Sequence, residues 1–177
     1  MPAIHSEFNQ EQNVQLACNV PILPLNTTRT KVKGPAPPCM AETDIVDEAI
    51  RYFRVNILFR NFELEGPADR TIAYLTAYLA DVVRHVKRHK TKQEAEQSVF
   101  VFAKKNFKIP GDAGFAFGGF FADPADRAES DLIRGYIKQL REEAAHRILD
   151  KLYNDDGTQN KHWFQFSKKK FMNLADV

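Results

Sequence analysis

Two histidines near the middle of the chain, His85 and His89, have a spacing that can bind zinc. Residues four apart lie on one face of a helix, so both imidazoles could reach the same ion. Their neighbours Arg84, Lys87 and Arg88 would repel a cation, and no glutamate lies between the histidines as in the H-E-x-x-H pattern. We therefore expect no metal site and interpret this segment as the solvated, basic end of a helix.

Other reactive side chains do not form a recognisable catalytic pattern. Glu142 and Glu143 are adjacent, so on a helix their side chains point about 100° apart and do not face each other. His146 is expected in mid-helix, in an Ala-rich context without a nucleophile. No Ser-His-Asp or Cys-His order can be assigned from spacing alone. The sequence predicts no enzyme activity, no catalytic residues and no cofactor.

Residues 107–121, FKIPGDAGFAFGGFF, hold four of the eight glycines and five of the fourteen phenylalanines. A Walker loop needs G-x-x-x-x-G-K-[ST], and a dinucleotide fingerprint needs G-x-G-x-x-G after a strand; neither pattern is present. Two interpretations stay open: a turn-rich connection whose rings fill the core, or a docking loop whose rings anchor a partner. The candidate partner interface is Phe115, Phe117, Phe120 and Phe121.

Two basic clusters suggest an alternative function, a helical module that binds nucleic acid or anionic lipid. Residues 84–92 carry five Lys or Arg, and Lys168, Lys169 and Lys170 form the second cluster. The whole chain has a net charge of +2, with 25 basic and 23 acidic residues. This even balance does not favour nucleic acid as a partner. No apolar stretch approaches the ~20 residues of a membrane span, so we expect no membrane insertion.

The composition indicates a globular protein of the reducing cytosol. At 177 residues and 44% hydrophobic content, the chain can bury a core without disulfides or metals. Cys18 and Cys39 are far apart and belong to no C-x-x-C pair, so we expect two reduced thiols. The N-terminus shows no signal-peptide pattern. A cytoplasmic protein is the expectation.

Residues 1–41 are predicted to form an extended N-terminal arm. Six of the nine prolines lie at or before Pro38, and each fixes φ and removes a backbone donor. Ile22, Leu23 and Leu25 are apolar, so we expect part of the arm to lie on the body; a flexible tail is the alternative. Residues 42–177 would form the helical body, and the whole of 1–177 a single all-α domain.

The body should contain about five helices, one of them largely buried and surrounded by the others. The helix over 43–61 is apolar on most sides and is predicted to be the central one. The second should run from Pro67 or Asp69 to His89. The third, through about Lys105, should begin with a capping box of Thr91 and Glu94. The fourth should run from about 126–130 to 153, and the tail is ambiguous, with helix favoured.

Seven segments, in this order, carry a resemblance to one family: MPAIHS at 1–6, KGPAP at 33–37, TDIVDEAIRYF at 43–53, ADRT at 68–71, IPGDAGF at 109–115, IKQLREE at 137–143 and KKKFMN at 168–173. The chain resembles the third, 21 kDa subunit of the actin-related protein 2/3 complex. Two segments depart from the family pattern. AFGGFFADP follows GDAGF where the family has a proline and a polar turn, and His162–Trp163 stands where the family has a Trp pair.

The resemblance implies a compact all-α structural subunit with no catalytic residues. The family belongs to a seven-subunit assembly that starts a new actin filament on the side of an existing one. The expected partners are the other subunits, chiefly actin-related protein 3, and the actin filament through the complex. The expected location is the actin cytoskeleton of the cytoplasm, at the cell cortex and its projections.

Overall fold

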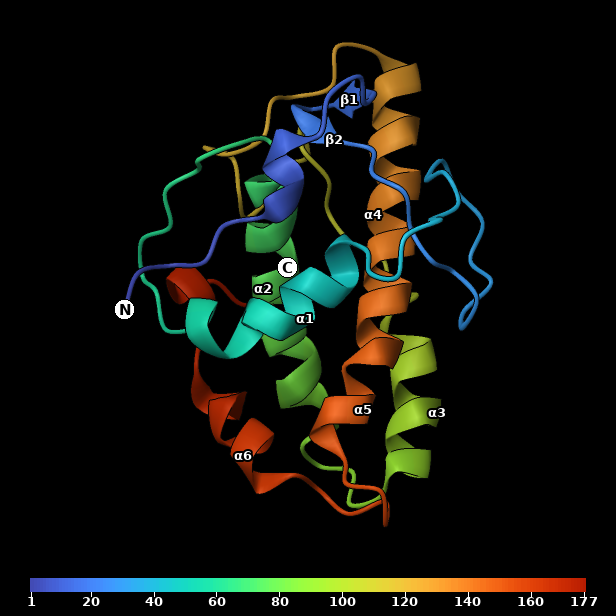
Figure 1. The fold of residues 1–177 in the computed structure, drawn as a ribbon, viewed down its shortest axis with the longest axis vertical. Coiled ribbons are helices and arrows are strands. Elements are labelled where there is room, and N and C mark those ends of the chain that lie inside the picture. Colours follow the sequence, from blue (N-terminus) through green and yellow to red (C-terminus); the bar gives the residue numbers. More distant parts are fainter.

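The computed structural model describes residues 1–177 and is mostly helical, as predicted (Figure 1). The helices are α1 (Ile45–Asn56), α2 (Asp69–Val86), α3 (Lys92–Phe102), α4 (Arg127–Arg147) and the one-turn α5 (Leu149–Leu152) and α6 (Lys161–Phe164). The 3₁₀ turns are Glu7–Gln10, Gln165–Lys168 and Phe171–Asn173. Two-residue strands β1 (Leu16–Ala17) and β2 (Val20–Pro21) form an antiparallel pair. No helix is both long enough and apolar enough to span a bilayer.

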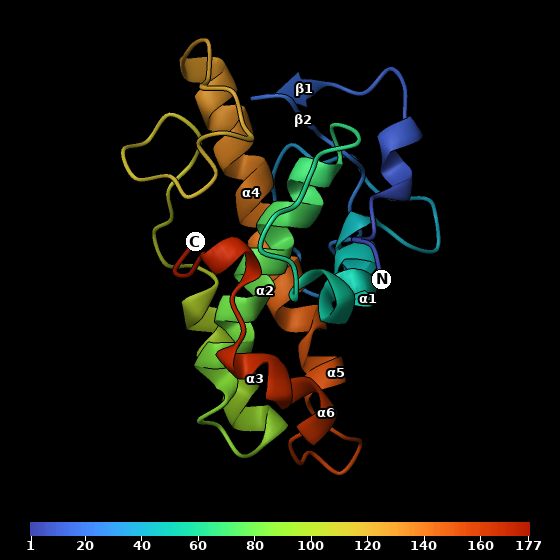
Figure 2. The ribbon, with the colours of Figure 1, turned by 90° about the vertical axis from the view of Figure 1, so that its left-hand side faces the viewer.

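The central helix is α2. Fifteen of its eighteen residues are buried, and it contacts α1, α3, α4 and both 3₁₀ turns of the tail. Figure 2 shows α2 between α1 on one side and α3 on the other, with the tail passing across it. Ala73, Ala77 and Ala80 are fully buried and let the neighbouring elements approach closely.

The prediction that the helix over 43–61 is the central one was wrong. The helix α1 ends at Asn56, and it exposes Arg51 and Arg54 three residues apart, which marks a solvent face. Beyond it, Leu58 is 57% exposed, while Phe62 is buried in a non-helical segment. The apolar run at 52–61 therefore serves one helix face and then a loop.

The helices α1, α3 and α4 each begin with a side-chain cap, as does the short α6, which Asn160 caps. Asp44 accepts the backbone N–H of Val46 and Asp47, and Asp47 accepts that of Asp44, so a full capping box starts α1. Asp126 caps α4. Thr91 caps α3, but the carboxylate of Glu94 accepts the N–H of Lys90 instead of that of Thr91, so the predicted box is only half formed.

The N-terminal arm differs from a uniformly extended segment. It contains a 3₁₀ turn and the β1–β2 hairpin, whose turn residues Cys18 and Asn19 have positive φ. Five of its apolar side chains are at most 3% exposed and belong to the main core: Ala17, Val20, Ile22, Leu23 and Leu25. The arm is therefore a structural layer of the molecule.

Further along, the arm follows the outer side of α4 (Figure 1). Ala36 donates its N–H to Gln139 Oε1 at 2.9 Å. At Gly135 a Cβ would lie 3.0 Å from Cδ of Pro35, so the missing side chain permits this close approach. The proline-rich segment forms no regular strand, so its backbone N–H groups need other acceptors. Side chains of α4 accept the N–H groups of Thr30 and Ala36.

The beginning of the arm is held by two buried carboxylates. Glu48 of α1 accepts Ser6 Oγ at 2.5 Å and the N–H of Glu7 at 2.7 Å. Asp69 of α2 accepts the N–H of Ser6 at 2.8 Å and lies 2.7 Å from Nδ1 of His5. Burial raises the pKa of Glu48, against the bonds from Ser6 and Glu7 that lower it. The N-terminal segment thus fastens α1 to α2.

Candidate functional site

The four phenylalanines of the candidate interface fall into two classes of exposure. Phe117 and Phe121 are 3% and 7% exposed and belong to the core, whereas Phe115 and Phe120 are half-buried. Phe115 meets Phe121 edge to face with ring centroids 5.3 Å apart, and Phe117 lies 5.9 Å from Tyr74 of α2. Phe117 and Phe121 therefore hold the loop on the body, and only Phe115 and Phe120 offer surface to a partner.

The glycines of this loop serve turns. Gly111 and Gly114 have φ of +92° and +80°, a region that other residues rarely adopt. Asp112 stabilises the first turn, since its carboxylate accepts the N–H of Ile109 at 2.9 Å. The loop is compact and internally packed.

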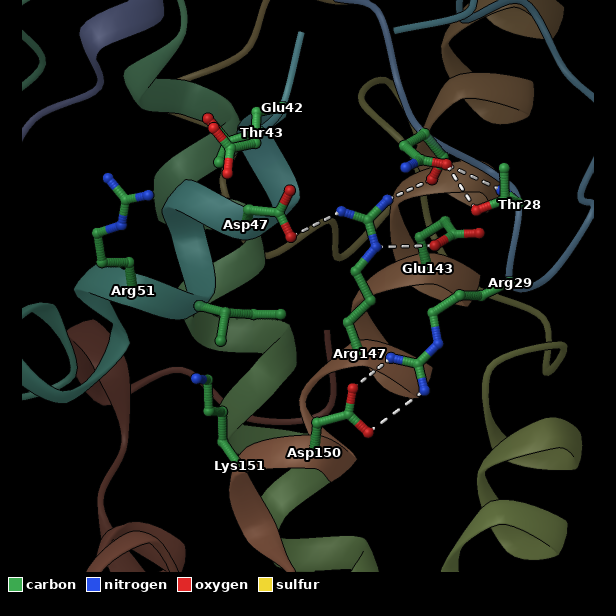
Figure 3. A pocket seen from close by; sticks show the side chains of 12 residues that line it. Thr28, Arg29, Glu42, Thr43, Asp47, Arg51, Glu143, Arg147, Asp150 and Lys151 are labelled. Carbon is green, nitrogen blue, oxygen red and sulfur yellow. Dashed lines mark hydrogen bonds and ion pairs between the residues drawn. The ribbon is translucent and has the colours of Figure 1, made fainter.

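A charged cleft of about 590 Å³ lies between the arm, α1 and the α4–α5 segment (Figure 3). Arg147 stands at its centre. Its guanidinium contacts Asp44 at 2.6 and 2.9 Å, Asp47 at 3.1 Å and Glu143 at 2.8 Å. It also donates to the carbonyl of Asn26 in the arm. One cation therefore joins the arm, the start of α1 and the end of α4.

The ion pair of Arg147 with Asp44 is deeply placed, with side chains 9% and 0% exposed. Burial by itself would raise the pKa of Asp44, but the hydrogen bonds and charge of Arg147 outweigh it and hold the pKa low. Glu143 also accepts Thr30 Oγ1 at 2.5 Å. These carboxylates are engaged by fixed donors, so the cleft is suited to joining elements and not to proton transfer.

The rim of the cleft is more open. Arg29 and Lys92 both contact Asp150, at 2.6 and 2.8 Å, with side chains one third to one half exposed. Arg51 and Lys151 extend along the cleft and form no ion pair (Figure 3). The exposed ion pairs of Asp150 with Arg29 and Lys92 contribute less than about 1 kcal/mol each to stability.

His85 packs into the seam between α2 and α3. Its Nε2 lies 2.7 Å from Ser98 Oγ, and its ring stacks on Phe102 with centroids 4.2 Å apart. Burial, together with the charges of Arg88, Lys105 and His89, lowers the pKa of His85 to about 4. No group of three or more His, Cys, Asp or Glu side chains is placed to hold a metal ion.

The two basic clusters have different surroundings. In the first, Arg84 pairs with Asp81 at 3.1 Å, and Lys92 pairs with Asp150. The lysines of the second cluster form no ion pair and line a hollow of about 290 Å³ together with Ile57, Leu58, Arg60 and Asn173. The second cluster is therefore the stronger candidate for an anionic contact.

Comparison with known proteins identifies the family. Residues 1–175 match the P21-Arc family model, described as the ARP2/3 complex ARPC3 (21 kDa) subunit. The chain belongs to this ARPC3 family. It is 44% identical over 174 residues to the actin-related protein 2/3 complex subunit 3 of Dictyostelium discoideum, which covers 97% of this chain and 98% of that protein. It is 40% identical to the subunit 3 of Arabidopsis thaliana over 172 residues (97% of each), and 40% identical to that of Schizosaccharomyces pombe over 177 residues (99% of each).

The ARPC3 family consists of non-catalytic subunits, in line with the prediction of no enzyme activity. The segments that carried the resemblance occupy structural positions in this member. MPAIHS contains His5 and Ser6, which fasten the arm, and TDIVDEAIRYF contains Asp44, the cap of α1 and partner of Arg147. The identification of the family from the sequence is confirmed.

Two important arginines were missed in the sequence. Arg147 carries the cleft network, and Arg141 is 3% exposed, donates to Tyr74 OH at 2.9 Å and lies over the rings of Tyr78 and Phe107. An arginine on a helix is usually solvated, so the sequence alone predicts no buried role for either residue. Arg141 follows Ile133 and Ile137 at four-residue spacing, which places it on the inner face of α4 and was a usable signal.

Proposed function

We propose that the chain is a non-catalytic structural subunit of the actin-related protein 2/3 complex and supports nucleation of branched actin filaments. The observation that carries the proposal is the family match over residues 1–175. The curated relatives bear the name of this subunit and are covered over 97% or more of their length. The whole chain, 1–177, is proposed to act as one domain in the actin cytoskeleton of the cytoplasm, at the cortex and its projections.

The physical role follows from the cost of nucleation. The first actin subunits lose translational and rotational freedom on meeting, with few contacts to offset this loss. An assembly that holds two actin-related subunits in place removes most of this cost beforehand. A subunit contributes by adding interface, which for a stable contact buries ~1,600 Å² in total. We propose that this chain packs mainly against actin-related protein 3 and contacts the filament only as part of the complex.

The structure supports a role as a stiff support. The arm is fastened at its start by Glu48 and Asp69 and further along by Arg147, so it presents a fixed surface. A preorganised surface loses little conformational entropy on binding. Phe115 and Phe120, half-buried on a loop that Phe117 and Phe121 hold down, are the proposed aromatic contacts.

Affinity purification of the tagged full-length chain from its own cells tests this function. At physiological salt we expect two actin-related proteins and the other subunits to co-purify in equal amounts. The complex reconstituted without the chain should form branches more slowly than the full complex in a fluorescence microscopy assay. A chain that purifies as a monomer, or branching at full rate without it, would contradict the proposal.

The basic cluster of Lys168, Lys169 and Lys170 favours one alternative, a module that binds nucleic acid or anionic lipid. These lysines and Arg60 line a hollow that no carboxylate neutralises. Binding to a labelled oligonucleotide or to phosphatidylserine vesicles at low salt should then be lost when the three lysines are changed to Glu. Absence of binding by the unchanged chain removes this alternative.

A further inference from the structure

The helix α3 exposes two large apolar side chains that are not part of the hydrophobic core. Phe100 is 53% and Val101 63% exposed. Lys104 lies with Nζ 3.7 Å from the centre of the Phe100 ring. A pair of adjacent exposed apolar residues of this size, next to cations, is a feature of surfaces that contact other molecules.

Three neighbouring hollows share lining residues: one beside the 106–116 loop and the C-terminus, and two between the C-terminal end of α3 and α4. The first, of about 350 Å³, contains Phe115 and shares Asn106 and Phe107 with the second, of about 370 Å³. The second shares Ala103 and Lys104 with the third, of about 120 Å³, which reaches Phe100. We call these three hollows together the α3–α4 groove.

The middle of the α3–α4 groove is strongly basic. It is lined by Lys104, Lys105, Arg134 and Lys138, with Asp131 as the one carboxylate. None of the three lysines forms an ion pair, and Arg134 has one contact, at 3.8 Å, with Asp112 outside this hollow. Lys104 and Lys105 lie instead over phenylalanine rings. These cations are available to an acidic partner.

We propose that the α3–α4 groove binds an acidic protein segment that carries a large apolar side chain. Its carboxylates would contact Lys105, Arg134 and Lys138, and its apolar side chain would cover Phe100 and Val101. This inference rests on the proposed function, since the assembly is what brings a segment of another protein to the groove. It adds the position and the chemistry of one contact.

Shape distinguishes a protein segment from a bilayer as the occupant. The cations line a hollow, which an extended chain can enter and a flat membrane surface cannot fill. Phe100 and Val101 lie about one helical turn before Lys104 and Lys105, which line the basic hollow. An occupant therefore needs acidic and apolar groups in one short stretch. Burial of the aromatic ring would supply most of the affinity, and the charges would supply orientation and rate of association.

Photo-crosslinking in the assembled complex tests the proposal. Benzoylphenylalanine is incorporated in exchange for Val101, the tagged complex is purified and irradiated, and the crosslinked peptide is identified by mass spectrometry. We expect one peptide of another subunit, with Asp and Glu outnumbering Lys and Arg around a large apolar residue. The same photoreactive residue in exchange for Asp155, in the exposed turn before α6, is the positional control.

Charge reversal provides the matched comparison. Lys105→Glu combined with Lys138→Glu should reduce the crosslink per recovered complex about tenfold. Lys87→Glu combined with Lys90→Glu makes the same change of charge at exposed, unpaired lysines outside the groove and should leave the crosslink unchanged. Circular dichroism confirms that both variants fold.

Each remaining result overturns the proposal. Recovery of the other subunits with no crosslink above the Asp155 control refutes the groove and leaves the proposed function standing. A crosslink to a neutral or basic peptide, or one that the Lys105 and Lys138 changes do not reduce, refutes the acidic segment. Sedimentation with phosphatidylserine vesicles that depends on Lys105 and Lys138, without a protein crosslink, assigns the groove to a bilayer. Failure to recover any subunit removes the proposed function and the inference with it.

Discussion

The helices α2 and α3 follow each other in the chain but differ in how much of their apolar surface is buried. In α2, fifteen of eighteen residues are buried, whereas in α3 only Ala95 and Val99 are. The apolar side chains of α2 face α1, α3, α4 and the tail, so every side of the helix has a neighbour. The end of α3 exposes Phe100 and Val101 to solvent.

This difference in burial distinguishes residues that stabilise the folded chain from residues that remain exposed on its surface. Burying an apolar side chain contributes about 1.5–3 kcal/mol, so the α2 residues account for much of the stability. Phe100 and Val101 contribute little of this kind while they stay exposed. Their contribution would come when another surface covers them, which is what a subunit in an assembly requires.

The largest expected effect comes from placing the same polar residue in each helix. Leu79→Asn in α2 removes a fully buried side chain and buries an amide, so the free energy of unfolding should fall by about 4 kcal/mol or more, much of a typical total of 5–15. Val101→Asn in α3 should change it by less than about 0.5 kcal/mol. Urea unfolding followed by circular dichroism measures both. Equal destabilisation of the two variants would mean that the end of α3 is part of the core.

A second comparison is between a buried and a half-buried phenylalanine of the 107–121 loop. Phe117 is 3% exposed and close to Tyr74 of α2, so Phe117→Ala should lower the free energy of unfolding by about 3 kcal/mol. Phe115→Ala, at a half-buried position on the first hollow of the α3–α4 groove, should cost about 1 kcal/mol. Thermal unfolding and co-purification with the other subunits are measured together. We expect Phe115→Ala to reduce co-purification more than its stability loss explains; the reverse order of the two costs would contradict the assigned exposures.

The features that the sequence predicted correctly are local ones. The Thr91 cap was predicted, and the starts of α1 and α4 were predicted within a few residues, because a helix start depends on a side chain and the backbone next to it. The bounds of α2 and α3 were predicted within a few residues for the same reason. Family membership rested on short segments and did not require the fold.

The features that the sequence did not predict depend on contacts between distant segments. Which helix is central is decided by how α1, α4 and the tail meet, and periodicity reports only that a helix has an apolar face. Phe115 and Phe117 are identical residues two positions apart, and only packing against Tyr74 separates them. Likewise, the pairing of Arg147 with Asp44 joins residues 103 positions apart.

The smallest predicted effect concerns the seam where α2 meets α3. Burial of His85 against Phe102 lowers its pKa from the ordinary 6.5 to about 4, so the unfolded chain binds a proton at this site more readily than the folded chain. Stability from this site is therefore present in full above pH 6.5 and is lost as the pH falls from 6.5 toward 4. Because the ring is partly exposed, solvent screens some of the effect. Between pH 7 and pH 5 we therefore expect the Tm of the unchanged chain to fall by about 2–4 °C more than that of His85→Gln.

The measurement is the difference in Tm between the unchanged chain and His85→Gln, taken at pH 7 and at pH 5. His162→Gln, at an exposed histidine whose ring makes no hydrogen bond, is the control for general effects of acid on the chain. The difference should shrink on acidification for His85→Gln and stay constant for His162→Gln. A constant difference for both variants would show that protonation does not weaken the α2–α3 seam. The free apolar end of α3 would then stay equally well supported at low pH, because the seam beneath it would not loosen.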